Sequence, residues 1–300
     1  MQQLTADDEI DLRELWNVIW REKWIILAVT ALFAVVSIIH ALKQPNLYTA
    51  TSLLVPTASE SNGGLGGLAA QYGGLAAIAG INLNKGGGSG KVTVALELLK
   101  DWNFIDQFIR KYQLEMPIFA GRGWDSQTDQ LVIDSNLYDQ ETNTWLTGVK
   151  PSSWQLYNAF SSFVVIDEDK IKGVIHLSVE YFSPGLAAEW NRLLIKEVNE
   201  YMREKDFQKA NNNIEFLREQ IKETSIKDLQ TVFFRLIEEQ TKVVMLAKAN
   251  EEYVLNTVGA AKAPEQRSKP KRTVIVLLGT TLGMVFALVI VFIRRTLKRN

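Results

Sequence analysis

The 300-residue chain has no cysteine and only two histidines. Without cysteine, neither a disulfide nor a thiolate metal site can form. His40 and His176 lie far apart in the sequence and each suits an ordinary structural position, so they do not make a metal-binding set. Asp167, Glu168 and Asp169 are adjacent acids of an expected turn, which fits a solvated hairpin end better than a paired general acid and base. The sequence therefore predicts no enzyme, no cofactor and no metal site.

The chain also lacks a strong net charge, with a formal value of −1. No basic patch suited to a phosphate backbone is present, which excludes nucleic acid as a partner. The run from Gly86 to Thr93 has the look of a phosphate-binding loop, but two required positions are wrong. Lys85 stands where the first glycine is needed, and Val92 stands where Ser or Thr would bind magnesium. We expect no nucleotide site there.

Two long apolar runs are the clearest features of the chain. Residues 273–293 contain no charge, and their 21 residues at about 1.5 Å each match the roughly 30 Å hydrocarbon core of a bilayer. Residues 24–42 are interrupted only by Thr30, Ser37 and His40. A cleaved secretory signal is the alternative for the first run, but the run is long for one and no small-x-small cleavage site follows it. Both runs predict transmembrane helices.

Basic residues around the first span indicate its orientation. Arg13, Arg21 and Lys23 precede it and only Lys43 follows closely, which places the N-terminus on the cytoplasmic side. The second span has basic residues at both ends and does not decide orientation by itself. With two crossings we expect a cytoplasmic N-terminal segment at residues 1–23 and a cytoplasmic tail at residues 294–300.

The region between the spans reads as an α+β domain over residues 43–183. A strand is expected at 48–55, before a glycine-rich, apolar loop at 63–90. Residues 113–150 are poorly patterned. A helix is expected at 91–112, with Val94 among the inward positions. A second helix is expected at 154–161, with Pro151 at its first turn. Strands at 163–166 and 174–181 are expected to form a hairpin across the polar turn 167–170.

A long helix is expected to start at Ser183 and Pro184, which suit the N-cap and the first helical position. Apolar residues then recur at spacings of three and four, and a single helix over residues 184–223 would be about 60 Å long. The run Thr224-Ser225-Ile226-Lys227-Asp228 offers a cap with an acid three residues on, and predicts a second helix running to about residue 252. We expect a long helical projection at 184–252, and then a return strand and proline-rich segment at 253–272 containing Pro264 and Pro270.

Small residues and exposed aromatics both point to association. Two narrow helices cannot bury Phe233, Phe234 and their other apolar positions alone, so neighbouring copies are expected to cover them in a homo-oligomer. In the second span Gly279 and Gly283 form a GxxxG pattern, and Ala287 extends the strip. Such strips let membrane helices approach closely, which predicts a role in helix packing.

Taken together, these segments resemble the polysaccharide co-polymerase, or chain length determinant (Wzz-type), family. The family commonly has three prolines spaced three apart, and here Pro264 and Pro270 match the ends while Arg267 takes the middle place. The resemblance covers nearly the whole chain and rests on residues 10–12 through 23–24, Ser183-Pro184 with Ala187, residues 199–203, residues 245–247 with Tyr253, the proline-rich segment and the GxxxG span.

The resemblance implies a ring of copies in the bacterial inner membrane, each with a periplasmic α/β base domain and a long helical hairpin. It implies a non-enzymatic regulator that works with a membrane-embedded glycan polymerase on a lipid-linked polysaccharide. The regulator would set chain length in the O-antigen of lipopolysaccharide or a related surface glycan.

Three alternatives remain open at the level of the sequence. A capsule or exopolysaccharide export subunit would work with a separate kinase, since the few residues after Ile293 do not hold a fused one. A two-span periplasmic sensor is disfavoured because the expected cytoplasmic segments do not hold an output domain. A membrane-fusion-type efflux adaptor also uses long hairpins, but its usual single anchor would not explain a second span.

Overall fold

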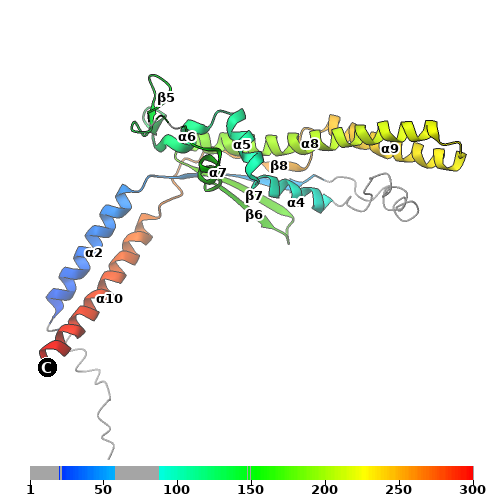
Figure 1. Cartoon of the computed structure of the whole chain (residues 1–300). Coiled ribbons are helices and arrows are strands. Elements are labelled where there is room, and N and C mark those ends of the chain that lie inside the picture. The colour runs from blue at the N-terminus through cyan, green and yellow to red at the C-terminus, as the bar shows by residue number, and fades with distance from the viewer. Residues whose placement is uncertain (1–19, 21, 58–87, 147, 149, 300) are drawn as a thin grey trace, which may run out of the picture. The chain divides into compact units, whose positions relative to one another are not determined.

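The computed structural model describes residues 20, 22–57, 88–146, 148 and 150–299 (Figure 1). It divides into two compact units, residues 1–46 with 267–300, and residues 47–266. The first unit pairs the helices α2 (Lys23–Lys43) and α10 (Arg272–Arg299), both long and apolar enough to cross a membrane. The second is an α+β unit that includes a long helical hairpin. The predicted fold class is confirmed. The N-terminal segment before residue 20 and most of the glycine-rich loop lie outside the described residues.

The second unit is built on a four-stranded antiparallel sheet in the order β6-β7-β1-β8. Its strands are β1 (Tyr48–Pro56), β6 (Val164–Asp169), β7 (Val174–Tyr181) and β8 (Leu255–Gly259). Every second residue of β7 from Ile175 to Tyr181 is buried, because alternate side chains of a strand share one face. Ala50 and Leu54 of β1 extend the same buried face. The predicted β6–β7 hairpin is confirmed.

One hydrophobic core joins this sheet face to the helices. The helices are α4 (Gly88–Leu98), α5 (Trp102–Lys111), α6 (Glu115–Ala120), α7 (Ser153–Ser161) and the first half of α8 (Pro184–Glu223), and Ala247 near the end of the next helix also belongs to this core. The expected single helix over residues 91–112 is wrong, because the Asp101 carboxylate accepts the Phe104 N–H and starts a new helix. Val94, expected inside, is exposed. Pro151 precedes the α7 N-cap, Ser152, which forms a capping box with Gln155.

Residues 113–150, which carried no clear pattern, contain α6 and two small hairpins. These pair β2 (Gly121–Asp125) with β3 (Gln130–Ile133), and β4 (Tyr138–Asp139) with β5 (Thr144–Trp145). They share one turn chemistry with the β6–β7 hairpin. In each hairpin, an aspartate carboxylate accepts the backbone N–H of the residue two positions later, and the last residue of the loop has a positive φ. The aspartates are Asp125, Asp139 and Asp169. The residues with positive φ are Asp129, Asn143 and Gly173. The β6–β7 turn therefore falls at residues 170–173, three positions later than expected.

The long hairpin consists of α8 and α9 (Lys227–Ala249). The 40 residues of α8 give a length of about 60 Å at 1.5 Å per residue, as the sequence predicts. The side-chain cap expected within residues 224–228 is wrong, because Thr224 closes α8 and α9 begins after Ile226 without a side-chain cap. The Gln230 amide instead donates to the carbonyls of Ile221 and Thr224, which closes the connection.

Candidate functional site: the apolar helix pair and the ties of the long helix

The described residues offer little for catalysis. Within them, no group of three or more histidines or acids is placed to hold a metal ion. His176 lies on β7 opposite Asp167 of β6, and the His40 ring lies 3.0 Å from the side-chain amide of Gln44, four residues later. The features that remain to be explained are the helix pair α2–α10, the polar ties that hold α8 to the sheet, and the surface of the hairpin.

The small residues of α10 lie against α2 of the same chain. A Cβ atom at Gly279 would overlap the side chain of Ser37, and one at Gly283 would overlap Phe33. Ala287, one turn further along, is fully buried. The Ser37 hydroxyl donates to the Ile275 carbonyl over 2.9 Å, which adds a polar tie between the two helices. Small residues thus allow close approach within the chain. Their predicted part in packing between copies stays a prediction.

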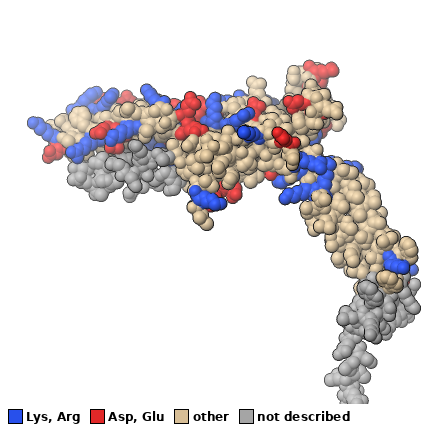
Figure 2. All heavy atoms as spheres, turned by 180° about the vertical axis from the view of Figure 1, so that it is seen from behind, with Lys and Arg blue, Asp and Glu red and all other residues tan. Residues whose placement is uncertain are grey.

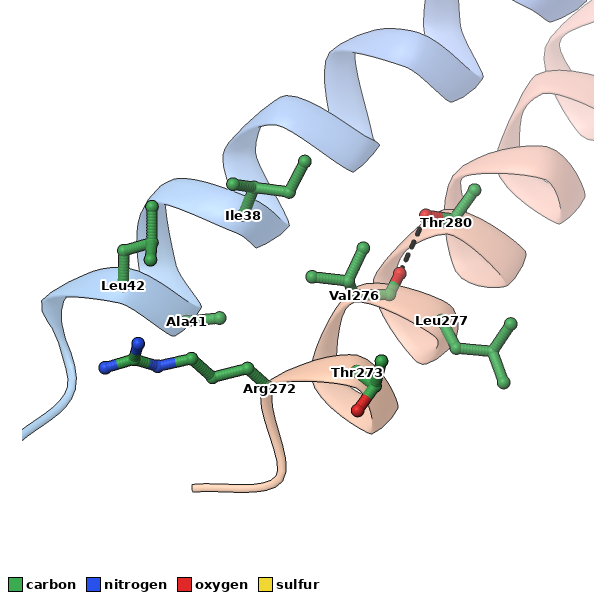
Figure 3. A pocket seen from close by; sticks show the side chains of 8 residues that line it. All are labelled: Ile38, Ala41, Leu42, Arg272, Thr273, Val276, Leu277 and Thr280. Carbon is green, nitrogen blue, oxygen red and sulfur yellow. Dashed lines mark hydrogen bonds between the residues drawn. The ribbon is translucent and has the colours of Figure 1, made fainter. Parts of the chain in front are cut away.

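The helix pair exposes many large hydrophobic side chains, among them Leu27, Leu278 and Phe286. Figure 2 shows that the face it presents carries Lys and Arg only toward its ends. A groove of about 450 Å³ opens between the helices where α2 ends and α10 begins (Figure 3). It is lined by Ile38, Ala41, Leu42, Arg272, Thr273, Val276, Leu277 and Thr280. Apart from the arginine and the two threonines, this lining is hydrocarbon.

The start of α8 is fixed by the two residues that the sequence singled out. Ser183 is the N-cap, and its hydroxyl accepts the N–H of Leu186. Pro184 occupies the first helical turn, where its missing N–H costs nothing. Ala187 behind them is fully buried, so the helix begins directly on the core.

Two buried asparagines tie α8 to the sheet. Asn191 accepts the Ser52 hydroxyl over 2.5 Å and donates to the carbonyls of Ala50 and Leu177. Asn199 accepts the backbone N–H groups of Val254 and Leu255 and donates to the Leu255 carbonyl; the three bonds measure 2.8, 2.9 and 2.9 Å. Both side chains are at most 1 % exposed. Sequence reasoning missed Asn191 altogether and noted Asn199 only for its resemblance. A polar residue repeating on an apolar helix face was the available signal.

A second tie joins α4, α8 and the segment before β8. Lys91 Nζ lies 2.6 Å from Asp206 Oδ2 and 3.1 Å from the Tyr253 hydroxyl, which itself donates to Asp206. Burial lowers the pKa of Lys91, but its bonds to Asp206 and Tyr253 outweigh that effect and leave the pKa raised. Burial raises the pKa of Tyr253. Lys91, which lies in the glycine-rich run 86–93 that looks like a phosphate-binding loop, therefore forms a structural ion pair with Asp206.

The hairpin beyond these ties has a small core of its own, in which Leu217 and Leu236 are buried. Phe234 remains 59 % exposed, and Phe216 and Met245 are also exposed. Such apolar surface on a narrow hairpin is typical of a face that another protein covers. Pro264 and Pro270 are half-buried residues outside any helix or strand, and they belong to different units.

The described features define a class of protein. In the sequence, one apolar helix precedes and another follows an α+β unit that carries a 40-residue helix. Comparison with known families gives two matches: residues 8–111 match a chain length determinant protein (Wzz) family model, and residues 227–296 match a G-rich domain on putative tyrosine kinase (GNVR). Over residues 8–111, about a third of the chain, the sequence is therefore similar to the Wzz chain length determinant family.

Solved structures give further similarities. A full-length bacterial polysaccharide co-polymerase is 13% identical with a TM-score of 0.38, covering 97% of this chain and 99% of that one. A fragment of WzzB, a polysaccharide co-polymerase from Salmonella Typhimurium, is 13% identical with a TM-score of 0.31, covering 75% of this chain and all of that one. No curated protein matches the chain.

Proposed function

We propose that the protein is a non-enzymatic regulator of polysaccharide chain length that acts as a co-polymerase beside a glycan polymerase. The observation that carries this proposal is the match of residues 8–111 to the chain length determinant family. That stretch includes α2 and the strand β1 at the centre of the sheet. The proposed role needs no catalytic group of its own, because the chemistry of chain growth belongs to the polymerase.

In its finer form the proposal places the protein in the bacterial inner membrane. Residues 1–23 and 294–300 lie in the cytoplasm, α2 and α10 span the membrane, and residues 47–266 extend into the periplasm. Copies assemble in a ring through their hairpins, which would cover apolar side chains such as Phe234. The polymer is a lipid-linked glycan such as the O-antigen of lipopolysaccharide. The size and surface of the ring set how long the growing chain and the polymerase stay together.

The test is a gel ladder of surface polysaccharide from cells with and without the gene, with the polymerase left intact. A defined modal length that becomes a random, short-biased ladder on deletion would support the proposal. The control is deletion cells that carry the gene on a plasmid, in which the modal length should return. An unchanged ladder would contradict chain-length control and favour the sensor or adaptor alternatives.

A second candidate function is export of capsule or exopolysaccharide together with a separate kinase. The match of residues 227–296 to a G-rich domain on putative tyrosine kinase favours it. That match spans α9, β8 and most of α10. The same ladder distinguishes the two functions, because loss of an export subunit removes surface polymer completely while loss of a length regulator changes only its size distribution.

A further inference from the structure

The groove between α2 and α10 has the size of a ligand site and the lining of a lipid site. Its volume of about 450 Å³ falls within the roughly 300–1,000 Å³ typical of small-molecule pockets. Figure 3 shows Ile38, Ala41 and Leu42 on one wall and Val276 on the other, with Arg272 at the mouth. Hydrocarbon walls with one charged group at an end match an amphiphile better than a polar solute.

Arg272 is incompletely paired. One Nη2–H donates to the Asn46 side-chain oxygen over 3.1 Å, while Nε is buried and has no hydrogen-bond partner. Across the described ranges, no carboxylate forms an ion pair with this guanidinium within 4.0 Å. A buried N–H without a partner is unfavourable, and the planar guanidinium fork is suited to a phosphate. The mouth of the groove is therefore equipped for an anion.

The groove is lined by one face of each helix. On α2 the lining residues are Ile38, Ala41 and Leu42. On α10 they are Thr273, Val276, Leu277 and Thr280. In both helices the lining residues recur at spacings of three or four, so they form a single stripe. Two single stripes on adjacent helices make room for one chain running along them. The backbone N–H groups of Arg272, Val274 and Ile275 already donate to the carbonyls of Pro270 and Lys271, so the start of α10 favours a negative charge only through the positive end of its helix dipole.

We propose that this groove binds a membrane lipid with one apolar chain and a terminal phosphate, the phosphate at Arg272 and the chain along Leu42 and Val276. This is the lipid chemistry on which a glycan can be carried through a phosphate. The proposal rests on the proposed function, since it identifies the part of the lipid-linked polysaccharide that the regulator holds. The glycan itself would extend from the phosphate, away from the apolar walls.

Binding of radiolabelled farnesyl phosphate to the full-length protein in neutral detergent tests the proposal. We expect saturable binding that farnesol, which has the same chain without phosphate, competes at least tenfold more weakly. Inorganic phosphate and phosphatidylglycerol, added at the concentration of the probe, should not displace it. Equal competition by farnesol would overturn the proposal, because the phosphate would then not be recognised. Displacement by inorganic phosphate or by the two-chain lipid would overturn it as well, the first by showing that the chain is not needed and the second by showing a general anionic-lipid contact.

Matched variants test the residues. Arg272→Gln should weaken farnesyl phosphate binding by about tenfold or more, the loss expected for one hydrogen bond to a charged group. Arg294→Gln removes an exposed cation near the other end of α10 and should leave binding unchanged. Thr280→Phe should fill the groove and weaken binding, whereas Leu282→Phe alters an exposed position outside the lining and should not. Equal effects of Arg272→Gln and Arg294→Gln would refute the assignment.

The two proposals fail separately. If deletion of the gene leaves the polysaccharide ladder unchanged while farnesyl phosphate still binds through Arg272, the groove stands as a lipid site and the chain-length function is wrong. If deletion disturbs the ladder but wild-type protein binds farnesol as well as farnesyl phosphate, the function stands and the groove proposal is wrong. Binding measured in wild type with the two ligands does not depend on the folding of any variant.

Discussion

Asn199 should be one of the most sensitive positions in the chain. Its side chain satisfies the N–H groups of Val254 and Leu255 and the Leu255 carbonyl, all at the point where the chain returns from the hairpin to the sheet. In Asn199→Leu these backbone groups lose their side-chain partner. At about 1–3 kcal/mol for each buried group left unpaired, the sum is about 3–9 kcal/mol, and partial relaxation favours the lower half. We expect a loss of about 3–5 kcal/mol.

A loss of that size is a large part of the roughly 5–15 kcal/mol by which domains are usually stable. The assay is urea unfolding of the full-length protein in detergent, followed by tryptophan fluorescence, because Trp190 is buried in the same core. Asn212→Leu, at an exposed position of the same helix, is the matched control and should change stability by less than about 0.5 kcal/mol. An Asn199→Leu protein within about 0.5 kcal/mol of wild type would refute the reasoning.

Three further predictions concern other parts of the chain. Gly279→Leu with Gly283→Leu should shift the modal polysaccharide length, because both new side chains collide with α2. Burial raises the pKa of the Tyr181 hydroxyl, so the folded state keeps a proton that the unfolded state loses above the ordinary tyrosine pKa. The free energy of unfolding should therefore fall as pH rises above about 10. Urea titrations at several pH values should show a smaller fall for Tyr181→Phe. Leu217→Ala should cost about 2–5 kcal/mol and speed hydrogen exchange in the hairpin, whose own core is small.

Each of these has a result that would contradict it. If the double variant of Gly279 and Gly283 is expressed normally and the polysaccharide length distribution is unchanged, these glycines do not affect chain length. An alkaline decline of the same slope in wild type and Tyr181→Phe would show that other groups control it. Exchange that increases equally in the hairpin and the sheet after Leu217→Ala would mean that the hairpin does not open on its own.

The elements that could be predicted from the sequence are those whose signal is local. The two uncharged runs predict α2 and α10, and Ser183-Pro184 followed by a long stretch of helical period predicts α8. The break at Asp101 was missed because an aspartate inside an amphipathic pattern reads equally well as an exposed helical residue. The strands of the small hairpins are too short to show an alternation of apolar and polar residues. A turn motif was nevertheless present in the sequence. It is an aromatic residue followed by aspartate, with threonine three residues after the aspartate, as in Trp124-Asp125 and Tyr138-Asp139.

The candidate sites were harder to predict because they depend on contacts across the chain. Asn199 meets Leu255, 56 residues later, and Asn191 meets Ser52, 139 residues earlier. Arg272 meets Asn46 across 226 residues. No local pattern records such pairs, since each residue type also occurs on ordinary exposed surface. The GxxxG strip could be found in the sequence, but its partner, α2 of the same chain, became evident only in the structure.

Reconstitution tests the central claim most directly. Polymerase and lipid-linked repeat units are placed in proteoliposomes with and without the full-length protein, and the lengths of the products are measured on a gel. The account predicts that the protein changes a broad, short-biased distribution into one with a defined modal length, at an unchanged chemical linkage. The same distribution in both preparations, with the protein present and folded, would contradict chain-length control.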